Sequence, residues 1–169
     1  MGKSLSISAG ILLVFALVQA AIFSNIPVLP SMPDFCMLCV LYFSLQNGRM
    51  HGELTGFISG LFLDFISGAP IGLNCFYRTV IGYLSGFFNK TLNSDGFVVP
   101  AILGFISTIL KALLLWFLSF VFPAKVLIFN PFNWGFLFEL AANTLLAPVI
   151  FKFLSIFRKS IILNPEKVI

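Results

Sequence analysis

Six apolar runs separated by short polar turns constrain this sequence more than any other feature. The runs cover residues 5–23, 35–46, 52–67, 71–88, 97–122 and 134–157. A helix needs about 20 mostly apolar residues to cross a bilayer, although the second run is short by this measure. The runs lack the period-two alternation of a membrane β-barrel. The expected fold class is therefore an all-α integral membrane protein, with residues 1–169 forming a single polytopic domain as a six-transmembrane-helix bundle.

The composition excludes several other classes of protein. Hydrophobic residues make up 59% of the chain and charged residues 9%, with a mean hydropathy of +1.06. A soluble domain carries about 25% charged residues, so this chain has too little polar surface for a soluble enzyme. In a membrane protein the net charge of +4 reflects orientation, and no nucleic-acid partner is expected.

The basic residues fall mainly on one side of the predicted membrane. Alternate loops place only Lys125 on one side and seven residues on the other: Lys3, Arg49, Lys90, Lys152, Arg158, Lys159 and Lys167. The positive-inside rule then predicts cytoplasmic N- and C-termini, with residues 24–34 and 123–133 outside. A cleaved signal peptide is the competing interpretation of the N-terminus, but the first run is longer than the usual apolar region of about 7 to 15 residues.

Four ionisable residues lie inside the apolar runs: Asp64, Arg78, Lys111 and Glu139. A charge near the bilayer centre costs at least about 2.5 kcal/mol, so such residues are expected to face the protein interior. Two acids and two bases cancel, which favours mutual pairing over a pathway for ions of one sign. These four residues are the first candidates for intramembrane structural or interaction sites.

Glycines recur at every fourth position on both sides of the turn at residues 68–70, and one charged residue shares the spacing of each series. The two series are Gly48, Gly52, Gly56, Gly60, Asp64 and Gly68, and then Arg78, Gly82 and Gly86. Small residues at this spacing let two helix backbones approach closely. A reversal at Ala69 predicts an antiparallel hairpin in which Gly60 lies opposite Arg78, Gly56 opposite Gly82, and Gly52 opposite Gly86.

An ion pair between Asp64 and Arg78 is predicted within this hairpin. Helical side chains tilt toward the N-terminus of their helix, so these two lean toward each other. Their offset in depth is about 7.5 Å, which a long arginine can cover across the gap left by Gly60. In the alternative, Asp64 is hydrated near the outer surface and Arg78 bonds to backbone carbonyl groups.

The same geometry disfavours a direct pair between Lys111 and Glu139, whose side chains lean apart. Each nevertheless belongs to a polar stripe expected to face the bundle interior. The stripes are Gly104, Ser107, Thr108 and Lys111 in the fifth run, and Glu139, Asn143 and Ala147 in the sixth.

No metal, cofactor or catalytic group is expected. Cys36, Cys39 and Cys75 all lie in or at the edge of apolar runs, where small packing residues are the simplest interpretation. His51 is interpreted as a polar turn residue. No nucleophile, base and orienting group lie together, so the chain is not expected to be an enzyme.

The segment from Gly56 to Gly72 resembles the signature of the bacterial rod shape-determining protein MreD family. The pattern is G-x3-G-x3-D-x2-S-G-x3-G, with Pro70 inside it, followed at residues 81–83 by an aliphatic residue, a small residue and Tyr. Residues 33–35 (Pro-Asp-Phe), at the start of the second run, also resemble that family, as do Asn143 and Pro148 in the sixth run. Lys111 departs from the acidic or neutral residue expected in its region.

The resemblance implies a non-catalytic scaffold of the bacterial inner membrane, in the machinery that elongates the lateral cell wall. The expected partner is MreC, within a wider complex that contains the actin-like MreB, the glycosyltransferase RodA and a class B penicillin-binding protein. The family is also similar in fold to the S component of energy-coupling-factor transporters. The alternative function is therefore a substrate-binding subunit of a vitamin-type transporter, with Glu139, Asn143 and Lys111 as candidate cavity residues.

Overall fold

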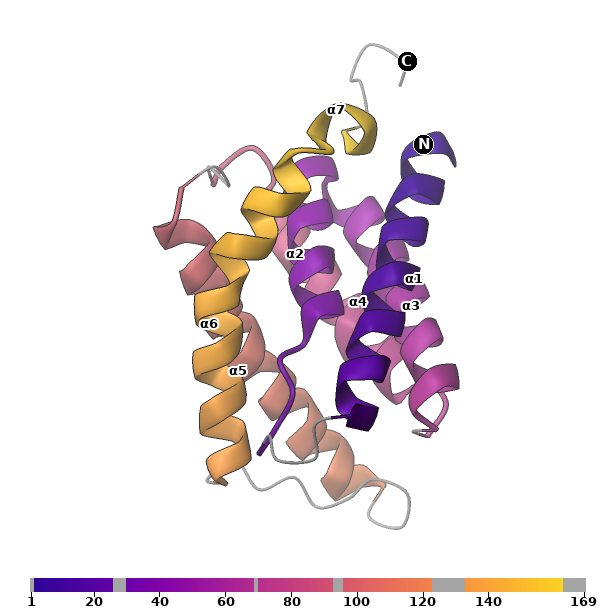
Figure 1. Cartoon of the computed structure of the whole chain (residues 1–169), viewed down its shortest axis with the longest axis vertical. Coiled ribbons are helices and arrows are strands. Elements are labelled where there is room, and N and C mark those ends of the chain that lie inside the picture. The colour runs from indigo at the N-terminus through magenta and orange to yellow at the C-terminus, as the bar shows by residue number, and fades with distance from the viewer. Residues whose placement is uncertain (1, 26–29, 69, 93–95, 123–132, 163–169) are drawn as a thin grey trace.

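The computed structural model describes residues 2–25, 30–68, 70–92, 96–122 and 133–162, and these residues form helices and no strands. The elements are α1 (Gly2–Asn25), α2 (Phe35–Asn47), α3 (Arg49–Ser67), α4 (Leu73–Ser85), η1 (Gly86–Phe88), α5 (Val98–Val121), α6 (Trp134–Ser155) and α7 (Arg158–Ile161). The expected all-helical class is confirmed, and each apolar run holds one of the helices α1 to α6 (Figure 1).

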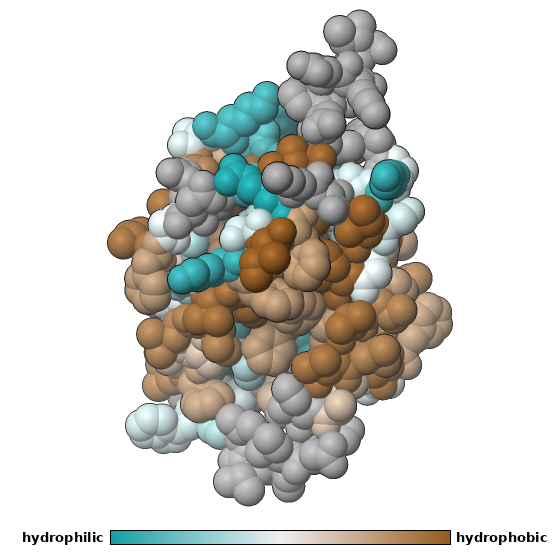
Figure 2. Space-filling model, turned by 45° about the horizontal axis from the view of Figure 1, so that its top comes forward, coloured by the Kyte–Doolittle hydropathy of each residue, from teal (hydrophilic) through white to brown (hydrophobic). Residues whose placement is uncertain are grey.

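Three of the described helices are long and apolar enough to cross a membrane. They are α1 over residues Gly2–Ala21, α5 over Val98–Val121 and α6 over Trp134–Ser155. Hydrophobic side chains cover the flanks of the molecule, whereas hydrophilic side chains gather toward the end at which α1 begins and α7 lies (Figure 2). This distribution is typical of a helical membrane protein, and the number of crossings stays a prediction.

The short helix α2 forms the centre of the bundle. Its 13 residues are apolar around nearly the whole circumference, and all ten residues from Cys36 to Leu45 are buried. A helix of this length is about 20 Å long, well short of a hydrocarbon core of about 30 Å. Residues 30–34 therefore lead inward from the end of the bundle at which α3 ends, and α2 begins within the bundle (Figure 1).

Helices α3 and α4 touch backbone to backbone through their glycines. A Cβ atom on Gly56 would clash with the carbonyl oxygen of Arg78, and one on Gly60 would clash with the Cα atom of Cys75. Gly52 and Gly82 face each other in the same way. These positions tolerate only hydrogen as a side chain, so the glycine series brings the two helices together as expected.

The register predicted for this hairpin is wrong by about one helical turn. Gly56 faces Arg78 instead of Gly82, and Gly52 faces Gly82 instead of Gly86, which itself packs against Arg49. The prediction assumed that α3 and α4 end level with each other. In the structure the last turn of α3 extends past the first turn of α4.

The reversal between α3 and α4 depends on two glycines with positive φ. Gly68 ends α3 at φ +66° and Gly72 precedes α4 at φ +98°, both in the left-handed region that favours glycine. Between them the carbonyl group of Pro70 accepts a hydrogen bond from the backbone N–H of Leu73 at 3.1 Å. The signature residues Gly68, Pro70 and Gly72 thus form the turn rather than a helix contact.

The interpretation of His51 as a turn residue is wrong. The break between α2 and α3 is Gly48 alone, at φ +87°, and His51 already belongs to the first turn of α3. Its side chain is buried, with Nε2 3.3 Å from the Ser8 hydroxyl group of α1. The imidazole therefore contributes to packing between α1 and α3.

Candidate functional site

Asp34 lies at the centre of a buried cluster of charged side chains. It is the N-cap residue of α2, and its carboxylate accepts a hydrogen bond from the backbone N–H of Met37 at 3.0 Å. Because α2 begins inside the bundle, this carboxylate is only 1% exposed. Its oxygens bind Arg78 Nη2 at 2.5 Å and Lys111 Nζ at 3.1 Å. One acid from the loop before α2 thus joins cations from α4 and α5.

Tyr77 lies between the two cations of this cluster. Its hydroxyl group donates to Asp34 at 2.9 Å and accepts a hydrogen bond from Arg78 Nε at 3.0 Å. The Arg78 guanidinium and the Lys111 ammonium each lie 5.4 Å from the centre of its ring. Both cations are within reach of a favourable interaction with the aromatic ring, in addition to their bonds to Asp34.

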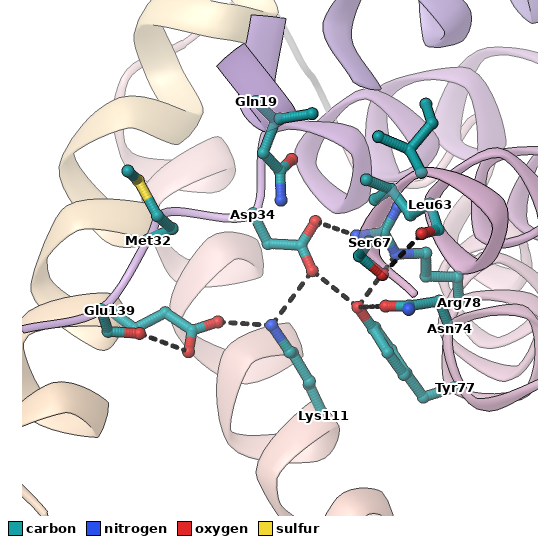
Figure 3. A pocket seen from close by; sticks show the side chains of 13 residues that line it. Gln19, Met32, Asp34, Leu63, Ser67, Asn74, Tyr77, Arg78, Lys111 and Glu139 are labelled. Carbon is teal, nitrogen blue, oxygen red and sulfur yellow. Dashed lines mark hydrogen bonds and ion pairs between the residues drawn. The ribbon is translucent and has the colours of Figure 1, made fainter. Parts of the chain in front are cut away.

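Lys111 also binds Glu139, which extends the cluster to α6. Lys111 Nζ lies 2.6 Å from Glu139 Oε1, and the hydroxyl group of Ser31 lies 3.4 Å from Glu139 Oε2 (Figure 3). The expectation that these side chains lean too far apart to pair is wrong. The flexible four-carbon chain of lysine overcomes the tilt of the Cα–Cβ bond, which was the whole basis of that expectation.

The predicted ion pair between Asp64 and Arg78 is also wrong, because the Arg78 guanidinium binds Asp34. The prediction measured depth from the turn and counted only charges inside the apolar runs. Asp34 precedes its run, and the short length of α2 brings it to the level of Arg78. Neither the hydration of Asp64 nor the bonding of Arg78 to backbone carbonyls describes the structure, since both side chains are buried and bonded to other groups.

Asp64 instead holds the first turn of α4. Its carboxylate accepts hydrogen bonds from the backbone N–H groups of Gly72 at 2.8 Å and Asn74 at 3.0 Å, and from the Asn74 side-chain amide at 2.8 Å. The first N–H groups of a helix have no partner within the helix and carry partial positive charge, so a carboxylate stabilises them. This bonding explains why α3 extends past the start of α4.

Asn143 ties α6 to α5 and to the segment before α2. Its side-chain oxygen accepts a hydrogen bond from the backbone N–H of Asp34 at 2.8 Å, and its side-chain nitrogen donates to the Thr108 hydroxyl group at 3.0 Å. Gly104 packs against Ala147 and the Asn143 backbone, where a Cβ atom would lie 2.9 Å from either. The two polar stripes of α5 and α6 therefore face each other.

The cluster is neutral, since Asp34 and Glu139 balance Arg78 and Lys111. Each carboxylate binds a cation and further donors, which compensates for the cost of removing the charges from water. Among the described residues no three His, Cys, Asp or Glu side chains lie close enough together to hold a metal ion. The ion pairs of this cluster hold four parts of the fold together: the N-cap of α2, α4, α5 and α6.

A cavity of about 540 Å³ adjoins the cluster, toward the end of the bundle at which α3 ends. Its wall combines Asp34, Tyr77, Arg78, Lys111 and Glu139 with residues from α1 and α3, among them Gln19, Leu63 and Ser67 (Figure 3). The predicted site residues thus divide into two groups. Arg78, Lys111, Glu139 and Asn143 meet around Asp34, whereas the glycines and Asp64 shape the α3–α4 hairpin.

Sequence reasoning missed Asp34, Tyr77 and Asn74 as members of the polar network. The available signal was the position of Asp34, directly after Pro33 and directly before the shortest apolar run. A short run predicts a helix that is buried in protein rather than exposed to lipid, and its cap residue then lies inside the bundle. Tyr77 and Asn74 offered no comparable signal, because nothing in their spacing identifies the face of α4 that they occupy.

The fold and this buried neutral cluster define an all-helical membrane protein whose internal charges are paired with one another. The family model described as rod shape-determining protein MreD matches residues 1–157 of the chain. The chain therefore belongs to the MreD family, which implies a role in rod shape determination. Comparison with curated proteins and comparison with solved structures find no match.

Proposed function

We propose that the chain is a non-catalytic scaffold of the bacterial inner membrane, in the machinery that elongates the lateral cell wall. Its direct partner would be an MreC-like bitopic protein. The wider complex would contain the actin-like MreB, the glycosyltransferase RodA and a class B penicillin-binding protein. In this role the chain helps to organise peptidoglycan synthesis and requires no cofactor.

The observation that supports a scaffold most strongly is the use of the buried charges. Asp34, Arg78, Lys111 and Glu139 all bind side chains of other segments of the same chain. Breaking a buried ion pair typically costs about 3 to 5 kcal/mol, so the cluster resists relative movement of α4, α5 and α6. A rigid bundle presents a constant surface to a partner, which is what a scaffold requires.

Capture from membranes tests this proposal. The tagged chain, purified in mild detergent from cells that grow as rods, should bring with it a bitopic protein that has a periplasmic domain. Replacing the chain by the neutral double variant Lys111→Met with Glu139→Gln should preserve both capture and rod shape, because Asp34 and Arg78 still pair. Capture of no membrane protein, or loss of rod shape despite normal accumulation of the double variant, would contradict the proposal.

A second candidate, the substrate-binding subunit of a vitamin-type transporter, has one observation in its favour. The cavity of about 540 Å³ has a mixed wall in which polar side chains such as Lys111 and Glu139 stand beside apolar ones, as is usual for a small-molecule site. The same capture experiment separates the two functions, since a transporter subunit would bring an ATPase module instead of a bitopic protein.

A further inference from the structure

Two residues of the cavity wall each carry a buried polar atom that has no hydrogen-bond partner within the described part of the chain. They are Nη1 of Arg78, on α4, and Oε1 of Gln19, on α1. Arg78 is 1% exposed, and both atoms are shielded from solvent. Buried polar groups are nearly always hydrogen-bonded, so an unpaired donor and an unpaired acceptor in one cavity wall require an explanation.

The two atoms have opposite hydrogen-bonding roles. Arg78 Nη1 can only donate a hydrogen bond, and Gln19 Oε1 can only accept one. The side chain of Gln19 extends from α1 toward Asp34 with its amide nitrogen nearest to that residue, and Arg78 binds the Asp34 carboxylate from α4 (Figure 3). A secondary amide supplies both missing partners in one planar group, because its carbonyl oxygen accepts and its N–H donates.

The charge of the wall selects an uncharged ligand. Arg78 and Lys111 balance Asp34 and Glu139, so a charged molecule would leave one charge uncompensated in a buried site. The rest of the wall includes apolar side chains such as Leu63 and Ile66, which favour an apolar substituent on the ligand. A volume of about 540 Å³ is within the range of small-molecule sites, about 300 to 1,000 Å³.

We propose that this cavity binds a small uncharged molecule that carries a secondary amide and an apolar substituent. The amide carbonyl oxygen accepts from Arg78 Nη1, and the amide N–H donates to Gln19 Oε1. This site goes beyond the scaffold function and does not depend on it, because no partner protein takes part in the binding.

The direct test is the binding of N-acetyl-leucine methylamide to the purified full chain in mild detergent. The probe is uncharged, carries two secondary amides and has an apolar side chain. It should raise the thermal unfolding midpoint in a concentration-dependent way and bind at least tenfold more tightly than N-acetylleucinate, which carries a negative charge. Absence of a shift, or tighter binding of the anion, would overturn the proposal.

Gln19→Leu isolates the acceptor without disturbing the cluster. Leucine has a similar volume and removes the unpaired oxygen, so the free protein should unfold at the same or a higher temperature. The affinity for the methylamide should fall about fivefold to tenfold, which corresponds to one hydrogen bond. Unchanged affinity would contradict the assigned contact.

Ile66→Trp tests the position of the site, because Ile66 lines the cavity. Ile106→Trp is the matched control: Ile106 is also an exposed helical isoleucine, on α5, and does not belong to the cavity wall. Ile66→Trp should abolish the stabilisation by the methylamide, whereas Ile106→Trp should retain it. Equal binding by both variants would place the probe elsewhere and overturn the proposal, while partner capture would still decide the scaffold function separately.

Discussion

Asp34 is the residue on which the buried charges depend. It binds two cations and Tyr77 while its own oxygen caps α2, so its four contacts serve two different purposes. Asp64 has the same side chain but binds only uncharged donors at the start of α4. The two aspartates therefore differ in what their negative charge contributes.

A comparison of Asp34→Asn with Asp64→Asn measures this difference. Asparagine can cap a helix as well as aspartate, so both variants keep an acceptor at the helix N-terminus. Asp34→Asn leaves two cations facing Glu139 alone and should lower the free energy of unfolding by about 3 to 5 kcal/mol. Asp64→Asn keeps only one of the two acceptor oxygens and should cost less, about 1 to 3 kcal/mol. Thermal unfolding in detergent gives both values, and equal losses would show that Asp34 acts only as a cap.

A double-mutant cycle tests the pair formed by Lys111 and Glu139. Lys111→Met leaves the cluster with one excess negative charge, and Glu139→Gln leaves one excess positive charge, so each should destabilise the protein. The double variant restores neutrality and should be more stable than either single variant. Additive losses would mean that the two side chains do not interact, despite the 2.6 Å between Lys111 Nζ and Glu139 Oε1.

At the residue scale, the sequence did not predict which charged side chains pair with each other. The four charges inside the apolar runs were identified because apolar surroundings make a charge conspicuous. Their pairing depends on how far each helix is displaced along its axis, and a sequence does not contain that displacement directly. Arg78 was paired with Asp64 by counting residues from the turn, whereas it binds Asp34, which lies in the segment before α2.

At the scale of elements, α3 and α4 contact each other through glycines, which have no side chain to separate the two backbones. Gly56, Gly60 and Gly82 each meet backbone atoms of the opposite helix, which leaves no room for a methyl group. The spacing of the glycines predicted this contact because a period of four residues places them on one helix face. The register was not predictable, because it follows from the bonds between Asp64 and the first turn of α4.

Gly60→Ala and Gly10→Ala form a matched pair of substitutions for this contact. Both glycines lie inside helices, but a Cβ atom on Gly60 would clash with the backbone of Cys75, whereas one on Gly10 meets nothing within 4 Å. Gly60→Ala should force α3 and α4 apart and reduce the yield of folded protein severalfold, and Gly60→Leu more so. Gly10→Ala should leave the yield unchanged. Size-exclusion chromatography of fluorescent fusions measures the yields, and similar yields for the two alanine variants would exclude a tight helix contact.

For the whole molecule, the apolar runs were sufficient to locate α1 to α6. A helix buried in protein or lipid requires an uninterrupted run of apolar residues, which can be read directly from the sequence. The fold class was accessible for the same reason, whereas the family was accessible from the spacing of glycines, Asp64 and Ser67 between residues 56 and 72. The cavity could not be predicted, since it lies between side chains from six segments: α1, the segment before α2, α3, α4, α5 and α6. The predicted outer loop at residues 123–133 lies almost wholly outside the described residues.

Orientation in the membrane gives a prediction for the molecule as a whole. Of the eight basic residues outside the centres of the apolar runs, seven lie on the predicted side of the termini and only Lys125 on the other, so both termini should be cytoplasmic. Reporter fusions after Lys3 and after Lys159 should both show a cytoplasmic location, and a reporter in the loop at residues 123–133 should be external. Opposite locations for the two termini would require an odd number of crossings and would exclude the six-span arrangement.

The complete enclosure of α2 has a consequence for how the protein is made. A segment of 13 residues is too short to be inserted by the translocon as an independent span, and its N-terminal carboxylate has no counter-charge until Arg78 and Lys111 have been synthesised. Ribosomal synthesis delivers α2 well before either cation. The centre of the molecule is therefore completed late, after α6 has been synthesised, because Asn143 and Phe151 of α6 contact Asp34 and Tyr42 at the centre.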